Sequence, residues 1–323
     1  MEISVVIPTF NNREVLRRTI ETLLEQTFPE AYEIVVADDG STDGTAEMVE
    51  AIRGPVPVRF VRQANLGRSA VRNLGARAAR GRVLLFIDSD VWATPTLLAE
   101  HYKHYARSDR RIGVMGVCLT HPDALVSPYM KARQVQADLT RRHHDDLNPL
   151  HVTTRNVSML RADLEAIGGF DERFGGYGWE DMDAAMRLHA QGVRIEYEPE
   201  ALGYHYHVET LETFREKMRQ AGIGAVYFWQ KYGRPANLGI FFEIAPVFLP
   251  LKWLVYQTPL VTPLIRWLLP WAEAKERVLI LAECYNHLIW RSYYDGVFAT
   301  LRQIRAGARA DAGRRSEERL PSG

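Results

Sequence analysis

The chain has 323 residues, of which 46% are hydrophobic and 25% are charged, enough for one large domain or two smaller ones with a substantial core. Lysine and arginine together number 40, as do aspartate and glutamate. This balance gives the chain no general positive field and excludes nucleic acid as an expected partner.

The first part of the chain alternates apolar runs with amphipathic segments. Strands are expected at 3–7, 33–37, 58–61 and 83–87, and helices at 13–26, 44–52 and 68–80. Short linkers between them predict a Rossmann-like α/β fold, a mostly parallel sheet with helices on both faces. Ligands bind such sheets at the carboxyl ends of the strands, where polar clusters fall at 8–11, 38–41, 65–68 and 88–90.

The last of these clusters, Asp88-Ser89-Asp90, ends a strongly apolar strand. Side chains alternate along an extended chain, so Asp88 and Asp90 project the same way. Two adjacent carboxylates are tolerated where a divalent cation lies between them and a polyanion such as a pyrophosphate. Alone, this short motif more often marks a solvated acidic turn.

Further elements follow in the second half of the chain. Helices are expected at 96–106, 180–191 and 210–232, and strands at 112–118, 156–160 and 193–197. The helix at 180–191 follows a glycine-rich loop at 174–178, and a pair of histidines, His205 and His207, follows the last strand at extended spacing. These histidines therefore share one face.

The segment 238–271 is strongly apolar and carries Trp253, Trp267 and Trp271. Charges and prolines divide it into pieces shorter than the roughly 20 residues that cross a bilayer. Short apolar helices with tryptophan suit the membrane interface. The alternative is a helical bundle packed on the core or on a second copy, which would give a homo-oligomer. A further helix is expected at 274–302, and the Arg-, Gly- and Ser-rich end from 305 to 323 predicts disorder.

The predicted compartment is the cytoplasm. The N-terminus runs directly into a strand, without the basic and long apolar segments of a signal peptide. Cys118 and Cys284 lie far apart and lack metal-site spacing, which predicts free thiols in a reducing compartment. A cytoplasmic protein with the apolar segment 238–271 could also lie peripherally on the inner face of the cell membrane.

Taken together, the motifs resemble those of inverting glycosyltransferases of family 2, which have the GT-A fold. They occur in family order at 5–11 (VVIPTFN), 38–45 (DDGSTDGT), 65–75 (NLGRSAVRNLG), 88–90 (DSD) and 178–181 (GWED). The resemblance covers residues 3 to about 207. It implies a GT-A domain at 1–235, with a nucleotide-sugar half at 1–92 and an acceptor half at 93–235, then an apolar helical extension at 236–304.

The same resemblance implies roles for individual residues. The donor would be a nucleotide-diphospho-sugar, bound by Pro8, Thr9, Asn11, Asp39, Arg68, Arg72 and Asp88. Mn²⁺ or Mg²⁺ would be held by Asp90, Asp88 and His205, with His207 as the alternative to His205. Asp181 would be the catalytic base and Glu180 its partner, with Tyr177, Gly178 and Trp179 at the acceptor.

The implied reaction needs a metal to neutralise the departing nucleotide diphosphate and a carboxylate to take a proton from the attacking hydroxyl. The acceptor would be a glycan or a lipid-linked molecule of polysaccharide, glycolipid or cell-envelope synthesis. Two other functions remain open. A sugar nucleotidyltransferase would want a glycine-rich basic loop after the first strand, which 8–12 lacks. A non-catalytic, membrane-associated nucleotide-sugar-binding protein would not need Glu180 and Asp181.

Overall fold

The computed structural model describes residues 1–106, 111–140, 149–233, 239 and 243–317. Its contacts divide the chain into two compact units. The first comprises Met1–Met130, Gln134–Gly175 and Glu180–Val208, and the second Lys131–Arg133, Gly176–Trp179 and Glu209–Gly323. This division differs from the sequence-based boundary at 235, because the helix after Val208 groups with the C-terminal helices.

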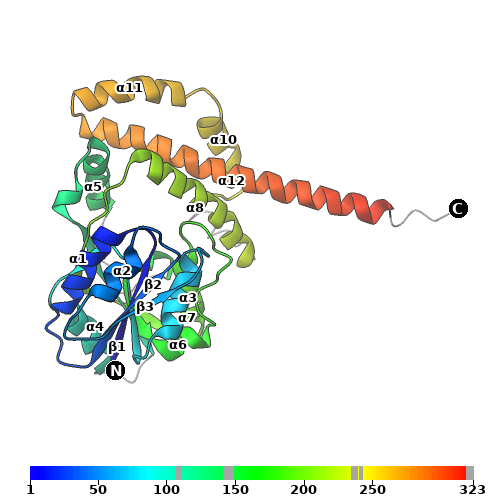
Figure 1. The fold of residues 1–323 in the computed structure, drawn as a ribbon. Helices are drawn as coiled ribbons and strands as arrows, with labels where there is room; N and C mark the ends of the chain where they lie inside the picture. Colours follow the sequence, from blue (N-terminus) through cyan, green and yellow to red (C-terminus); the bar gives the residue numbers. More distant parts are fainter. Residues whose placement is uncertain (107–110, 141–148, 234–238, 240–242, 318–323) are drawn as a thin grey trace. The chain divides into compact units, whose positions relative to one another are not determined.

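The first unit is built on one eight-stranded sheet of order β3-β2-β1-β4-β7-β6-β8-β5. Figure 1 labels β1, β2 and β3 of this sheet. Its strands are β1 (Ile3–Thr9), β2 (Tyr32–Asp38), β3 (Val58–Arg62), β4 (Val83–Ile87), β5 (Val91–Ala93), β6 (Ile112–Thr120), β7 (Asn156–Leu160) and β8 (Arg194–His205). The strands β1 to β4 pair in parallel. Antiparallel pairs enter with β7, between β4 and β6, and with β5, which pairs with β8.

Helices cover both faces of this sheet, as the alternating pattern predicts. On one face, α1 (Arg13–Leu24), α2 (Thr45–Ala51) and α4 (Leu97–Ala106) bury apolar side chains against Val5, Ile34 and Leu85. On the other, α3 (Arg68–Ala78), α6 (Arg161–Ala166) and α7 (Glu180–Ala190) pack on residues such as Phe86. Apolar surface buried on both faces explains why the central strands are continuous apolar runs. The α/β fold class is confirmed.

The first unit also contains two short 3₁₀ helices, η1 (Pro122–Ala124) and η2 (Pro149–His151). The α-helix α5 (Pro128–Thr140) belongs to it as well, except for Lys131–Arg133, which groups with the second unit.

The second unit consists mainly of α8 (Leu211–Lys231), α10 (Leu249–Gln257), α11 (Thr262–Ala274) and α12 (Val278–Glu317). The helix α12 continues beyond residue 305, where the sequence predicts disorder, because its end is rich in the strong helix formers alanine and arginine. Residues 318–323 lie outside the described residues. Within the described part of the chain, every helix is too short or too polar to cross a membrane.

The helices α8 and α12 approach each other at two glycines. A Cβ atom on Gly222 would lie 2.0 Å from the carbonyl oxygen of Tyr293, and one on Gly296 would lie 2.0 Å from that of Arg219. Both neighbours are backbone atoms, which cannot move aside as the end of a side chain can. Glycine at these two positions is therefore what permits the close crossing.

Gly222→Ala is expected to lower the free energy of unfolding by about 1–3 kcal/mol, the usual range for overpacking. Alanine in an unobstructed helix interior would instead raise it by about 1 kcal/mol, so the sign of the change is diagnostic. Chemical denaturation measures it. Gly175→Ala is the matched control, because a Cβ there meets no atom within 4 Å. Equal stability of both variants and the wild type would contradict the close crossing.

Candidate active site

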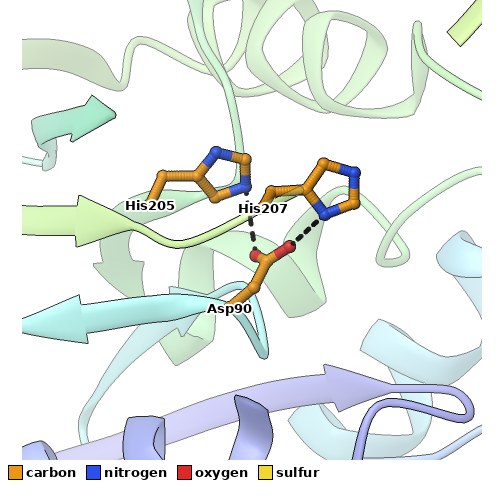
Figure 2. Close-up of side chains that lie close together, drawn as sticks. All are labelled: Asp90, His205 and His207. Atoms are coloured by element: carbon orange, nitrogen blue, oxygen red, sulfur yellow. Dashed lines mark ion pairs between the residues drawn. The ribbon is translucent and has the colours of Figure 1, made fainter. Parts of the chain in front are cut away.

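Three potential metal ligands meet at one end of the sheet (Figure 2). Asp90 Oδ1 lies 3.2 Å from His205 Nε2, and Asp90 Oδ2 lies 3.0 Å from His207 Nδ1. The two imidazole rings are stacked, with centroids 5.4 Å apart. Sequence reasoning prefers His205 and keeps His207 as its alternative, whereas the structure brings both to the same carboxylate.

Strand pairing explains how residues 115 positions apart come together. The short strand β5 begins at Val91, directly after Asp90, and pairs antiparallel with the end of β8, so that Val91 lies opposite His205. The amide of Tyr206 donates a hydrogen bond to the carbonyl oxygen of Asp90. Asp90 is thereby held beside both histidines by the backbone of the sheet.

The electrostatics of this group suit a cation. Burial opposes ionisation of Asp90, but hydrogen bonds from His205 and His207 and their charges outweigh it and hold the pKa of Asp90 well below its usual range. One ligand atom from each residue lies within 4.8 Å of the others. A carboxylate and two imidazoles, all partly accessible to solvent, are a donor set that fits a divalent transition metal.

Asp88, the other predicted metal ligand, does not belong to this group of three. Its Oδ1 atom lies 3.3 Å from Nη2 of Arg72, and Nη1 of Arg72 donates a 2.9 Å hydrogen bond to Oε1 of Glu180. Arg72 and Glu180 are both buried. Although the sequence predicts that Arg72 contacts the donor, the structure places its guanidinium between two carboxylates of the protein.

Asp181 follows Glu180 at the start of α7 and is the predicted base. Burial, and next the negative charge of Glu180, raise the pKa of Asp181 to about 7, while the charge of Arg72 and a hydrogen bond from the amide of Met182 oppose this rise. A carboxylate with a pKa near neutrality is suited to accepting a proton at physiological pH. The helix N-terminus would favour the ionised form, so burial outweighs it here.

The predicted donor residues lie at the carboxyl ends of β1 and β2. Thr9 is buried, and its hydroxyl has no hydrogen-bond partner among the described residues. Asn11 has a left-handed backbone, with φ of 47°, and its side-chain oxygen accepts a hydrogen bond from the amide of Thr42. Pro8, which precedes Thr9 in β1, is half-buried. These residues form a rim at the end of β1, with one buried hydroxyl that has no partner among the described residues.

Asp39 connects this rim to the loop before α3. Its carboxylate accepts hydrogen bonds from the amides of Leu66 and Gly67, both 2.9 Å, and from the side chain of Gln63 at 2.8 Å. Arg68, which begins α3, is exposed. Asp39 is thus a candidate contact for the nucleotide base, and it also orders the loop of the third predicted motif. The sequence did not indicate this second role.

In the second unit, the predicted acceptor residues Tyr177, Gly178 and Trp179 form a strained loop. Gly178 and Trp179 have φ values of 86° and 80°, and a bulky residue rarely adopts such a conformation. The Trp179 indole donates a 2.6 Å hydrogen bond to the carbonyl oxygen of Ala221. It also rests where a Cβ on Gly224 would come within 2.5 Å of it. Contacts with α8 therefore fix Trp179 in its strained state.

Comparison with known proteins gives a family match. The model of glycosyl transferase family 2 matches residues 4–168, half of the chain, and a model described as N-terminal domain of galactosyltransferase matches residues 151–211. The chain is similar to validoxylamine A glucosyltransferase from Streptomyces hygroscopicus subsp. limoneus, with 32% identity over 69% of this chain and 54% of the relative. The chain thus spans about half the length of that relative.

Solved structures share the fold at low sequence identity. A mannosyltransferase from Pyrobaculum calidifontis, in complex with GDP-Man and Mn²⁺, aligns with a TM-score of 0.58 at 19% identity, over 91% of this chain and 86% of that one. TarS 1–349 from S. aureus, in complex with UDP-GlcNAc, aligns with a TM-score of 0.54 at 19% identity, over 95% and 92% of the two chains. These likenesses confirm the predicted GT-A fold.

Proposed function

The chain belongs to glycosyltransferase family 2, and we propose that it moves a sugar from a nucleotide-diphospho-sugar to a glycan or lipid-linked acceptor with inversion at the anomeric carbon. The observation that carries the proposal is the placement of two chemically distinct groups in the first unit. Asp90, His205 and His207 form a cation site, and Asp181 is a carboxyl group with its pKa near 7. A single displacement needs both and no covalent nucleophile.

The cation that we propose is Mn²⁺, ahead of Mg²⁺. Asp90 supplies a carboxylate oxygen and the two histidines supply ring nitrogens. Mg²⁺ prefers oxygen ligands and keeps much of its water, so a set with two imidazoles favours a softer ion. When bound, the ion would neutralise the charge of the departing diphosphate.

The donor is proposed to lie along the rim formed by Pro8, Thr9 and Asn11, with Asp39 beneath it. The buried, unpartnered hydroxyl of Thr9 supports this placement, because such groups are rare unless a ligand or water satisfies them. The solved relatives bind GDP-Man in one case and UDP-GlcNAc in another. Both have a nucleotide-diphospho-sugar in common, and that is the donor class proposed here.

The proton from the acceptor hydroxyl is proposed to pass to Asp181. Its carboxyl group is ionised above pH 7 and protonated below, so it can accept a proton and release it again. Tyr177, Gly178 and Trp179 immediately precede this residue and its neighbour Glu180 in the sequence. We propose that they contact the acceptor.

Thermal denaturation in the presence of a panel of sugar nucleotides tests the donor class. A donor at about 100 times its Kd stabilises the folded protein by about 2.7 kcal/mol, so a nucleotide-diphospho-sugar with Mn²⁺ is expected to raise the melting temperature by several degrees. The corresponding nucleoside monophosphate is the control. A panel without any such shift would contradict the proposal.

A membrane contact through the extension is also proposed, and it would suit a lipid-linked acceptor. In α11, Leu264, Trp267 and Trp271 recur at helical spacing, and their side chains are 59%, 75% and 47% exposed. Leu260, two residues before the helix, is also 65% exposed, and Lys275 follows the helix. Exposed tryptophan and leucine along one face, next to a basic residue, are typical of a helix that lies in the interface of an anionic bilayer.

Trp267→Ser is expected to reduce binding to phosphatidylglycerol vesicles by about 10-fold or more, because it removes the most exposed aromatic side chain of the stripe. Sedimentation with vesicles measures the binding. Val126→Ser is the control, since Val126 is 65% exposed on another segment. Wild-type protein that stays in the supernatant would contradict the membrane contact. A dimer that Trp267→Ser converts to a monomer would instead assign the stripe to a second copy.

A further inference from the structure

Arg72 is a buried cation at the centre of the carboxylates of the candidate active site. Only 3% of the residue is exposed, although it belongs to α3, whose first residue, Arg68, is exposed. Nη1 donates to Oε1 of Glu180 at 2.9 Å, and Nη2 lies 3.3 Å from Oδ1 of Asp88. The guanidinium therefore reaches two carboxylates with its two terminal nitrogens.

Glu180 depends on this contact for its charge balance. It is 2% exposed, and its second oxygen, Oε2, is buried without a hydrogen-bond partner among the described residues. A buried carboxylate without a cation is strongly disfavoured. Arg72 is the basic residue that the described structure pairs with Glu180, so its guanidinium is the contact that holds this side chain in place.

The two carboxylates come from different parts of the sequence. Asp88 directly follows β4, at the predicted donor side, whereas Glu180 begins α7 and immediately precedes the predicted base. A guanidinium has a rigid planar fork, so two carboxylates bound to it hold a fixed relative position. Arg72 thus ties the donor-side loop to the helix end that carries Asp181.

The surroundings of Arg72 leave little of its guanidinium accessible to the sugar-nucleotide donor. The guanidinium carbon lies 6.0 Å from the centre of the Phe170 ring, and its Nε atom is buried with no partner among the described residues. A residue that bound phosphate or base would need an N–H group directed at the donor. Each terminal nitrogen directs an N–H group at a carboxylate of the protein, and with 3% of the residue exposed little of the guanidinium is open to a donor.

We propose that Arg72 is a positioning residue for sugar transfer, which holds Glu180, and with it the adjoining Asp181, against the loop that carries Asp88. It acts on turnover and not on donor affinity. This inference rests on the proposed function, since it assigns a part in the same reaction, and it replaces the donor contact that the family resemblance implies for Arg72.

The test separates donor affinity from turnover in Arg72→Lys. Lysine keeps the positive charge that Glu180 needs but has one ammonium group in place of the fork. The donor Kd, measured calorimetrically with Mn²⁺, is expected to stay within about threefold of the wild type, while kcat for nucleoside diphosphate release falls by about 100-fold, the scale of a misplaced catalytic group. Arg77→Lys, on the exposed side of the same helix, is the matched control and is expected to change neither quantity.

Circular dichroism establishes that each variant is folded. If Arg72→Lys does not fold, Arg72→Gln, which retains an N–H donor, carries the same expectation. A kcat within threefold of the wild type would overturn the inference. So would a donor Kd raised 10-fold or more with kcat unchanged, which would make Arg72 a donor ligand. If the wild type releases no nucleotide from any donor, the proposed function fails first, and the inference fails with it.

Discussion

Asp181→Asn is expected to lower kcat for sugar transfer by about 10³-fold, within the range for losing a general base, while the donor binds as it does to the wild type. Asparagine has nearly the shape of aspartate but cannot accept the proton of the acceptor hydroxyl. Steady-state transfer and calorimetric donor binding measure the two quantities. Turnover retained within 10-fold would remove Asp181 as the base.

The pH dependence of the transfer rate, compared between the wild type and Asp181→Asn, is a second test of Asp181 as the base. Burial and the charge of Glu180 raise the pKa of Asp181 to about 7 in the folded protein, from an ordinary value of 3.8. The wild-type rate is therefore expected to rise with pH and level off above about pH 7, as the base becomes ionised. Asp181→Asn would lose this rise along with most of its activity.

Stability should respond in the opposite direction. Between about pH 4 and 7 the folded protein holds a proton that the unfolded chain releases, so this group favours the folded state at low pH and destabilises it as pH rises through 7. At pH 8, Asp181→Asn is expected to melt at the wild-type temperature or above it. If the variant melted well below the wild type at pH 8, the ionised Asp181 carboxylate would not be destabilising the folded protein, contrary to this account.

Asp90→Ala is expected to abolish tight Mn²⁺ binding and to lower transfer by about 10²–10³-fold, the scale of losing a group that stabilises developing charge. The variant removes the only carboxylate of the three-residue group and leaves His205 and His207 without a common partner. Calorimetric titration with Mn²⁺ and the transfer assay measure both effects.

Asp123→Ala is the control for that experiment, since the Asp123 side chain is 80% exposed, lies 3.8 Å from Nδ1 of His121 and is not part of the three-residue group. It should bind Mn²⁺ as the wild type does. Full metal-dependent transfer by Asp90→Ala would contradict the assignment of the cation site. An equal loss in both variants would point to a general effect of removing acidic residues.

The sequence predicted the half of the fold that local patterns determine. Apolar runs such as Val83–Ile87 became the central strands, because a strand buried on both faces must be apolar throughout. The alternation of strands and helices set the parallel arrangement of β1 to β4 and hence the edge where Thr9, Asp39 and Asp88 lie. These are consequences of short-range patterns and of the handedness of crossover connections.

Other parts of the site depend on long-range pairing, which the sequence does not display. The three-residue strand β5 is too short for a periodic signal, yet its pairing with β8 brings Asp90 to both histidines. Arg72 and Arg68 lie one helical turn apart, a spacing that predicts a shared face of the helix. Only the position of α7 shows that Arg72 is covered and faces Glu180. The strained backbone of Trp179 likewise depends on α8, which follows it by more than 30 residues.

The central claim is that the protein releases a nucleoside diphosphate as it transfers a sugar, with help from a cation held by Asp90, His205 and His207. Measuring the nucleotide product from the best-binding donor, with Mn²⁺, with EDTA, and with Mn²⁺ restored, tests it most directly. The account predicts nucleoside diphosphate release that stops with EDTA and returns with Mn²⁺. Formation of nucleoside triphosphate from the donor and pyrophosphate, or donor binding without any release, would contradict it.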